Sequence, residues 1–502
     1  MKRKIFALLL GSLMSLTACG GGATNHEVDQ NLPDGYPKSE KQILFWHCLG
    51  QEKRNNLLRI VNQFNAQYAG KYNVVLDALA GDYSSLSSDV MTKLQAGTVP
   101  AMTMGYPDTF ADLITNNIKH SAILRLNNFI SDPNYGFTQD ELDDFVPAYY
   151  AEGSNYQFEG TWSMPMYKST EVMYYNRSFF SGVNDMNDVK FAGNSEYNTL
   201  RALCTDIYDD DIFDNLNNLK TWVAAHDGYT YDVPESWQDL FELAQQIKTD
   251  YANKPTGFVP VGYDSDSNLM ITQLEQRGFA YTTNENVKKE ADHFQFNNQN
   301  TINLVTEITN LINNKLLVTK NTNGNSYTSD LFTAGKCLMS IGSTGGSTYQ
   351  KSTTFVVGLA PVPAFRDTSG VLHKKYIQQG PSVCFFDNQD PQIHKGAWLF
   401  YKMMAEPENN ATLALDNSYD PIRISSYTTD YYRGFIAKAN QNLGLQYDIP
   451  YITNQLKDNY MTSPVFKGSA TARDEIGNII TYVVRMGYSV TESVRRAYNA
   501  CY

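Results

Sequence analysis

The chain has 502 residues, and its 53 acidic side chains outnumber the 40 Lys and Arg, which gives a net charge of −13. Phosphate contacts need Lys and Arg, so an acidic chain with no basic stripe is not expected to bind nucleic acid. The length exceeds what one hydrophobic core supports and predicts at least two lobes.

The N-terminus has the pattern of an export signal. Lys2, Arg3 and Lys4 precede an uncharged apolar run over residues 5–18. Fourteen helical residues span about 21 Å, less than the roughly 30 Å of a bilayer core, which favours a cleaved signal peptide over a membrane span. Removing the three basic residues moves the net charge from −13 to −16.

Leu16-Thr17-Ala18-Cys19 resembles the lipobox of bacterial lipoproteins. The resemblance implies cleavage before Cys19 and a diacylglycerol on its thiol, with stable anchoring by two acyl chains. The alternative is an ordinary signal peptide with a chance cysteine. Residues 19–40 lack apolar periodicity and are rich in Gly, Asn, Asp and Pro, so we expect a flexible tether of about 25 Å.

After the tether, strand and helix patterns alternate. Ile43–Trp46 and Asn73–Leu79 have strand patterns, and apolar residues between Leu57 and Tyr68 follow helical spacing. This β-α-β order predicts a parallel sheet. Further along, the pattern predicts a helix over Trp237–Ile247, a strand over Gly335–Ile341, a helix over Ala397–Met404, and a last helix with Ile476, Ile479, Ile480 and Val483 on one face.

Metal and disulfide signals are weak. Five cysteines follow Cys19 without a CxxC spacing, and the seven His show no HExxH motif, so we expect no metal, no cofactor and no required disulfide. Residues 181–235 interrupt the alternation with few structural signals. Their acidic run Asp209–Asp211 indicates a solvated loop or a helix start, with calcium binding as a weaker alternative.

Several motifs are similar to those of the extracellular solute-binding proteins (family 1), and most of all to the glycerol-3-phosphate-binding branch. In chain order they are FWH (45–47), FNAQY (64–68), LQAGTVPAM (94–102), GTWSMPMYKSTEVMYYN (160–176), SWQDL (236–240), GKCLMSIGSTGGS (335–347) and AEPENNATLALDNSYDPIR (405–423). They cover most of the mature chain.

The resemblance implies a set of ligand-binding residues. They fall on Tyr83 in GDYSSL, Ser169 in YKSTEV, Trp237 in SWQDL, Ser343 in IGSTGG, Gly380 in QQGPS, Tyr419 in NSYDPI and Arg473 in TARDEI. One position departs from the family, because its glutamate falls on Pro107 in MGYPDT. The neighbouring Asp108 is the candidate replacement. Because of this departure, a sugar remains an alternative ligand.

Residue chemistry allows a functional and a structural interpretation of each site. Arg473 carries a planar donor fork for phosphate or paired hydroxyls, or forms a salt bridge with Asp474 or Glu475. The turn over residues 343–346 exposes N–H groups to a ligand, or is an ordinary turn. The aromatic candidates stack on a ligand or fill the core.

The resemblance implies an α/β fold of the two-lobe, periplasmic-binding-protein-like type II, with a hinged central cleft. We expect lobe 1 to comprise 41–165 and 344–420, and lobe 2 to comprise 166–343 and 421–502, with the insertion 181–235.

The implied function is that of a monomeric, exported lipoprotein that captures glycerol-3-phosphate, a related diester or a small carbohydrate and delivers it to the permease subunits of an ABC importer. Its only membrane contact would be the lipid anchor. Alternatives are an oligosaccharide receptor without phosphate recognition, a passive surface adhesin, and a surface glycan hydrolase. No nucleophile elbow or catalytic carboxylate signature supports the hydrolase.

Overall fold

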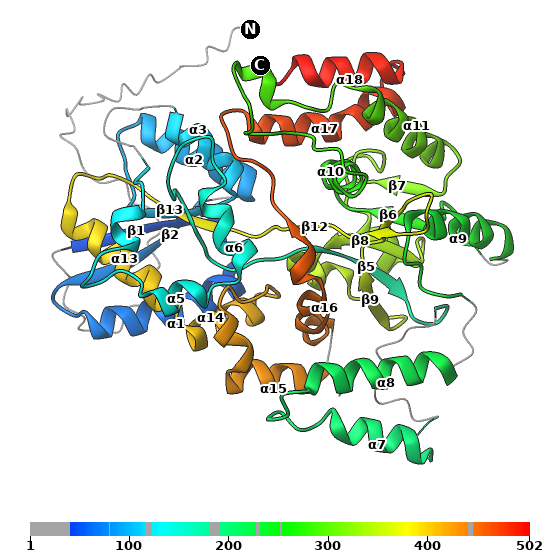
Figure 1. The fold of residues 1–502 in the computed structure, drawn as a ribbon, viewed down its shortest axis with the longest axis horizontal. Coiled ribbons are helices and arrows are strands. Elements are labelled where there is room, and N and C mark those ends of the chain that lie inside the picture. The colour runs from blue at the N-terminus through cyan, green and yellow to red at the C-terminus, as the bar shows by residue number, and fades with distance from the viewer. Residues whose placement is uncertain are drawn as a thin grey trace, which may run out of the picture.

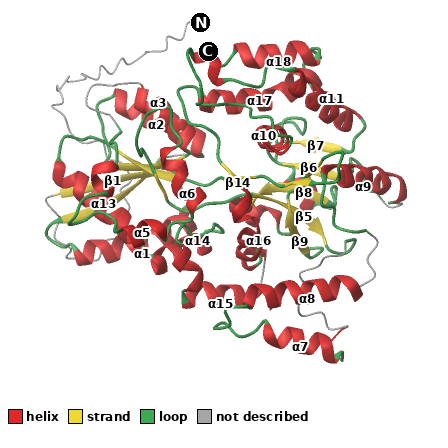
Figure 2. Ribbon diagram, viewed as in Figure 1, coloured by secondary structure: helices red, strands yellow, loops and turns green. Residues whose placement is uncertain are grey.

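Two five-stranded sheets, each with its own helices, form two lobes that lie side by side (Figures 1 and 2). The computed structural model describes residues 41–79, 81–115, 123–180, 191, 193–226, 231–251, 254–439 and 445–502. The expected signal peptide, Cys19 and the tether lie outside the described residues. No helix in these ranges is long and apolar enough to cross a membrane.

The first lobe has the strand order β2-β1-β3-β13-β4. Its strands are β1 (Lys41–His47), β2 (Tyr72–Ala78), β3 (Met102–Gly105), β4 (Met164–Pro165) and β13 (Ser382–Phe385). Its main helices are α1 (Gln51–Gln67), α2 (Tyr83–Gln95), α3 (Pro107–Thr115), α4 (Asn127–Ile130), α5 (Gln139–Asp143), α6 (Pro147–Ala151), α13 (Pro391–Met404) and α14 (Pro407–Asp416). The parallel pairing of β1 with β2 confirms the β-α-β pattern.

The second lobe has the strand order β7-β6-β8-β5-β9. Its strands are β5 (Glu171–Asn176), β6 (Val261–Tyr263), β7 (Leu317–Thr319), β8 (Met339–Ser343) and β9 (Val357–Pro361). Its helices are α9 (Trp237–Asp250), α10 (Asp266–Gln276), α11 (Gln299–Asn313), α12 (Ser329–Thr333), α16 (Ile449–Leu456), α17 (Ser469–Val484) and α18 (Val490–Asn499). The strand β8 begins at Met339, later than expected, because Gly335 forms the positive-φ turn after α12.

Both sheets follow one plan. In each, three parallel strands adjoin a fourth strand that is antiparallel to its neighbours: β13 lies between β3 and β4, and β5 lies between β8 and β9. A separate hydrophobic core packs around each sheet. The expected two-lobe type II α/β fold is confirmed.

The chain crosses between the lobes in extended segments. Residues 166–170 connect β4 to β5, and residues 378–381 connect β12 (Tyr376–Ile377) to β13. The two segments are hydrogen bonded, since Ser169 and Gln379 exchange N–H to O contacts of 2.9 and 2.8 Å. β12 also pairs in parallel with β14 (Tyr460–Met461), which precedes α17.

The second crossing comes later than expected. We expected residues 344–420 in lobe 1, but β9 pairs with β5 in the second sheet. The glycine-rich turn after β8 leads into a 3-10 helix (Thr344–Gln350) packed near α12, and the chain rejoins the first sheet only at β13. A turn motif by itself does not show which sheet the next strand joins.

The insertion contributes two helices, α7 (Ser195–Leu203) and α8 (Ile212–His226). With α15 (Asp430–Ala439) they form a third hydrophobic cluster (Figure 1, bottom). The acidic run lies at the start of α8, where Asp209 accepts hydrogen bonds from Asp211 and Asn215, and Asp210 pairs with Arg433 at 2.8 Å. Residues 181–190, 192 and 227–230 lie outside the described residues.

Candidate functional site

A polar cavity lies where the two lobes meet. Tyr106, Asp108 and Glu152 line it from lobe 1, Arg473 from lobe 2, and Gln378 and Gly380 from a crossing segment. Its volume is about 40 Å³, enough for about one water molecule. The lobes are close together here, since Gly468 N–H donates to Asp112 Oδ1 at 3.1 Å and Ser469 Oγ donates to the carbonyl of Asp108 at 3.3 Å.

Asp108 is brought into this cavity by the first turn of α3. Pro107 starts the helix, as proline does well in a first turn, and so places Asp108 at its N-terminal end. Asp108 Oδ1 is buried and has no hydrogen-bond partner among the described residues. Burial raises the pKa of this carboxyl, while Arg473 works in the opposite direction. Oδ1 is therefore an unused acceptor on a carboxyl that lies close enough to Arg473 to be influenced by its charge.

Arg473 reaches the cavity from the other lobe, on α17. Its Nη2 donates to Asn268 Oδ1 at 2.8 Å, and neither Asp474 nor Glu475 forms an ion pair with it among the described residues. Burial works to lower the pKa of Arg473, but Asp108, Tyr281, Tyr106 and Glu171 together hold it above its usual value. The guanidinium therefore stays charged where it lines the cavity.

Gln378 and Gly380 of the crossing segment contribute in different ways. Gly380 has φ +92°, and a Cβ there would lie 2.7 Å from the carbonyl oxygen of Tyr167. Glycine is therefore required where the crossing segments touch. Gln378 is 5% exposed, and both polar atoms of its amide are buried without a partner among the described residues. Such groups cost about 1–3 kcal/mol each until they are satisfied, so they favour a ligand that hydrogen bonds with them.

A buried ion pair fixes the crossing segments beneath the cavity. The Lys168 ammonium contacts the Glu152 carboxylate, Ser382 Oγ at 3.0 Å and the Gly380 carbonyl at 3.4 Å. Ser382 also donates to Glu152 at 3.1 Å. Burial lowers the pKa of Lys168, and Glu152 opposes that change. Glu152 thus lines the cavity with its charge already compensated.

An aromatic cluster adjoins the cavity through Tyr106. The rings of Tyr83 and Tyr106 lie 4.6 Å apart, and those of Tyr167 and Tyr419 lie 4.3 Å apart. The Lys53 ammonium lies 4.8 Å from the Tyr419 ring centre. The structure therefore brings the expected Tyr83 and Tyr419 together beside the cavity, in a surface of ring faces with polar tips.

Ser343 lies close to this cluster, but its turn differs from the expectation of exposed N–H groups. Gly345 N–H donates to Ser343 Oγ at 3.3 Å, and Thr344 N–H donates to the carbonyl of Thr170 at 2.8 Å. A Cβ on Gly345 would meet the Tyr419 ring at 2.8 Å. The turn therefore closes against lobe 1, and two of its donors are already engaged.

Of the expected residues, Asp108, Gly380 and Arg473 line the cavity, whereas Tyr83, Ser169, Ser343, Tyr419 and Trp237 are not part of its lining. Trp237 has a core position instead. It is 1% exposed within the second core, and its Nε1 donates to Gln276 at 2.7 Å. A capping box between Ser236 and Asp239 starts α9 at this tryptophan and turns the ring inward. Of its two interpretations, the structure supports the core role.

Gln378, Glu152 and Tyr106 line the cavity but are not among the residues predicted from the sequence. Gln378 stands between an apolar strand and Gly380, and a polar residue in that position was a usable signal. The sequence around Glu152 and Tyr106 contains no such signal, because the residues with which they interact lie far away in the chain.

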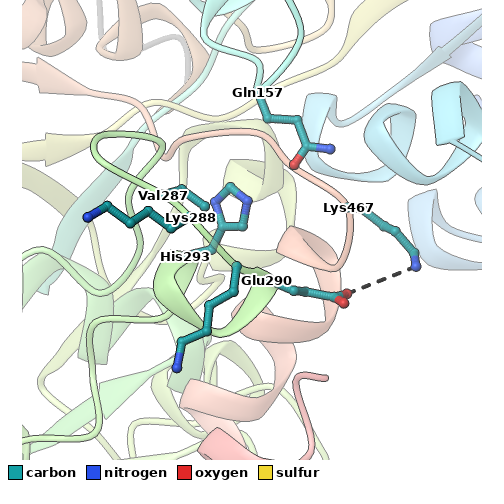
Figure 3. A pocket seen from close by; sticks show the side chains of 7 residues that line it. Gln157, Val287, Lys288, Glu290, His293 and Lys467 are labelled. Atoms are coloured by element: carbon teal, nitrogen blue, oxygen red, sulfur yellow. Dashed lines mark ion pairs between the residues drawn. The ribbon is translucent and has the colours of Figure 1, made fainter.

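A second pocket is larger but less suited to a ligand. It has a volume of about 320 Å³ and is lined by residues such as Gln157, Lys288, His293 and Lys467. In Figure 3 the ammonium groups of Lys288 and Lys467 point away from each other, and Lys467 pairs with Glu290 at 4.0 Å. Because its charges do not converge on one point, volume is a poor guide here, and the smaller cavity is the better candidate.

Comparison with known proteins agrees with this architecture. The sn-glycerol-3-phosphate-binding periplasmic protein UgpB of Pectobacterium atrosepticum is 22% identical over 404 residues, which cover 79% of this chain and 76% of that protein. Among solved structures, UgpB from Mycobacterium tuberculosis in complex with glycerophosphocholine superposes with a TM-score of 0.64 at 15% identity, covering 92% of this chain and 98% of that one.

Carbohydrate-binding proteins share the fold as well. Lmo0181, an ABC substrate-binding protein from Listeria monocytogenes in complex with cycloalternan, gives a TM-score of 0.64 at 13% identity, covering 92% of this chain and 98% of that one. A family profile described as bacterial extracellular solute-binding protein matches residues 59–433. The chain therefore belongs to the bacterial extracellular solute-binding proteins.

Proposed function

We propose that this solute-binding protein captures a small polyhydroxylated ligand between its lobes and delivers it to the permease of an ABC importer. Glycerol-3-phosphate, its diesters and small carbohydrates all belong to this ligand class. The observation that carries the proposal is the meeting of Asp108 and Arg473, from opposite lobes, at one cavity. A ligand that bonds with both side chains stabilises the closed arrangement of the lobes.

The unpartnered polar atoms support a hydroxylated ligand. Asp108 Oδ1 accepts from a hydroxyl group, Arg473 donates to one, and the amide of Gln378 does both. The cavity holds about one water molecule as it stands, so the ligand enters when the lobes separate. Tyr83 and Tyr419 extend the proposed site with ring faces, and Ser169, Ser343 and Gly380 shape its edge.

The charge of the site favours ligands of low negative charge. Arg473 is one cation, and Asp108 and Glu171 are carboxyls close enough to influence its pKa. A phosphate group would therefore meet both attraction and repulsion, whereas sugar hydroxyls meet no repulsion. Neutral carbohydrates are accordingly the preferred members of the proposed class.

The hydrolase alternative lacks a suitable carboxylate pair at this cavity. Glycosidases need two carboxyl groups that can act as acid and as base or nucleophile. Asp108 has a free oxygen, but Glu152 is held by Lys168 and Ser382. Steady turnover of chromogenic glycosides would favour the enzyme over the receptor.

The proposed location follows from the lipobox at Cys19. Two acyl chains would hold a monomer at the outer face of the cell membrane, and the tether of residues 19–40 would let it reach its permease. Replacing Cys19→Ala is expected to move the protein from the membrane fraction to the soluble fraction.

Calorimetric titration of residues 20–502 tests the ligand class. The panel is glycerol-3-phosphate, glycerophosphocholine, maltose and maltotriose. We expect saturable binding of at least one carbohydrate. Binding of the phosphate compounds alone would overturn the preference for neutral ligands, and no saturable heat with any compound would contradict the proposed function.

A further inference from the structure

A chain of buried hydrogen bonds extends from Arg473 into the second lobe. Arg473 Nη2 donates to Asn268 Oδ1 at 2.8 Å, and Asn268 Nδ2 donates to Glu171 Oε1 at 2.7 Å. The other carboxylate oxygen of Glu171 accepts from the Tyr263 hydroxyl at 2.5 Å. Four side chains on β5, β6, α10 and α17 are thus joined by three hydrogen bonds.

This chain fixes the direction of Arg473. Glu171 is 2% exposed, Asn268 is 4% exposed and Tyr263 is fully buried. Glu171 and Tyr263 lie on strands of the second sheet. Ser265 caps the N-terminus of α10, and its hydroxyl accepts a hydrogen bond from the backbone N–H of Asn268. With the Asn268 amide bonded at both ends, it has one favourable orientation, and that orientation gives Arg473 an acceptor.

The same chain brings a carboxyl group close to the guanidinium of Arg473, which lines the cavity. Glu171 lies behind Asn268 and does not line the cavity itself. The titratable groups around it are Tyr263 and Asp264 at the end of β6, Tyr174 on β5, and Arg473 on α17. Burial raises the pKa of Glu171 to about 7, and the hydrogen bonds from Tyr263 and Asn268 and the charge of Arg473 work to lower it.

Resting on the proposed function, we propose that Glu171 and Asn268 are positioning residues that aim Arg473 and, through the charge of Glu171, determine the preference of the site for neutral over anionic ligands. Asn268 transmits the position and Glu171 supplies the charge. Neither residue is expected to touch the ligand.

The direction of the pH effect follows from the charge of Glu171. Below pH 7 the carboxyl of Glu171 is mostly neutral. It then offsets less of the positive charge with which Arg473 attracts an anionic ligand. Above pH 7 the carboxylate offsets part of that charge. The affinity for an anionic ligand therefore falls as the pH rises through 7. The expected decrease is on the order of 5-fold, because a screened interaction between two charges has about this magnitude. The affinity for a neutral ligand changes little.

The first test needs no ligand. The guanidinium nitrogen signal of Arg473, assigned by its loss in Arg473→Lys, is followed by NMR from pH 6 to pH 8. We expect a titration with a midpoint near pH 7 in the wild type and in Glu275→Gln, a control on α10 whose carboxylate pairs with Lys375. Glu171→Gln should remove the titration, and Asn268→Leu should shift and broaden the signal. A wild-type signal that does not change with pH would overturn the inference.

The second test uses calorimetric titration with two probes whose charge is constant over this range. They are glycerophosphoglycerol, a phosphodiester without the second pKa near 6 of a monoester, and maltotriose, which is neutral. The ratio of anion to sugar affinity should fall about 5-fold from pH 6 to pH 8 in the wild type and stay constant in Glu171→Gln. An equal pH dependence in both proteins would overturn the inference, even if both bind.

The failure of this inference is distinguishable from that of the proposed function. If neither probe binds the wild type, the proposed function fails, while the Arg473 signal still decides whether Glu171 and Asn268 position the guanidinium. If Glu171→Gln does not fold, the pH profile of the wild type and the Asn268→Leu spectrum decide the question.

Discussion

Replacing Lys168→Met should destabilise the protein strongly, because it leaves a buried carboxylate without its counter-charge. The Lys168 side chain is fully buried and that of Glu152 is 8% exposed. Without the ammonium, the Ser382 hydroxyl is the one side-chain donor that Glu152 keeps among the described residues. Removing one partner of such a pair costs about 3–5 kcal/mol of unfolding free energy.

Urea unfolding of the single and double variants measures this effect. Adding Glu152→Gln to Lys168→Met removes the unpaired charge and should restore most of the lost stability. Lys467→Met is the matched control, because Lys467 is 57% exposed and its pair with Glu290 at 4.0 Å should contribute less than about 1 kcal/mol. A Lys168→Met protein as stable as the wild type, or a double variant no better than the single, would refute the reasoning.

Three further changes separate stability from binding. Gly380→Ala should lower the unfolding free energy in urea by about 2–4 kcal/mol, because Gly380 has a φ of +92° and lies close to the other crossing segment. Its control is Gly434→Ala on α15, where a Cβ meets no neighbouring atom, so stability should stay unchanged or rise. Trp237→Phe leaves the side-chain carbonyl of Gln276 without its indole donor and should lower the unfolding free energy by about 1–3 kcal/mol. The ligand affinity measured by calorimetry should change by no more than about 2-fold. Asp108→Asn should weaken carbohydrate binding about 10-fold through loss of a charge-assisted hydrogen bond, and wild-type affinity would remove Asp108 from the site.

Local patterns predicted the elements well. The strand expected over Ile43–Trp46 lies inside β1, and the strand expected over Asn73–Leu79 is offset by one residue from β2. The helical spacing between Leu57 and Tyr68 marks the second part of α1, which begins earlier, at Gln51. Helical spacing also gave the buried face of α17, with Ile476, Ile479 and Ile480 in the second core. These features depend on residues close together in the chain, where periodicity carries the signal.

The lobe boundary was less predictable because it depends on long-range pairing. The turn after Ser343 looked like a crossing, but the following strand joins β5, and only hydrogen bonding between distant strands decides that. Trp237 illustrates the same limit for the site. Its motif fitted a cleft residue, but a capping box turned the ring into the core.

The hydrogen bonds that connect Arg473 to Asn268, Glu171 and Tyr263 could not be predicted from the sequence either. Asn268, Glu171 and Tyr263 come from three separate segments and acquire their roles only when β5, β6 and α10 pack together. Asp108, by contrast, was proposed from its place beside Pro107, and the structure puts it opposite Arg473 at the cavity.

In the proposed function the ligand binds between the lobes at Arg473. The most direct test is calorimetric titration of Arg473→Ala beside Lys467→Ala, using the compound that binds the wild type most tightly. We expect at least about 30-fold weaker binding for Arg473→Ala, the scale of losing charged hydrogen bonds, and wild-type affinity for Lys467→Ala. Unchanged affinity in a folded Arg473→Ala protein would contradict the interlobe site.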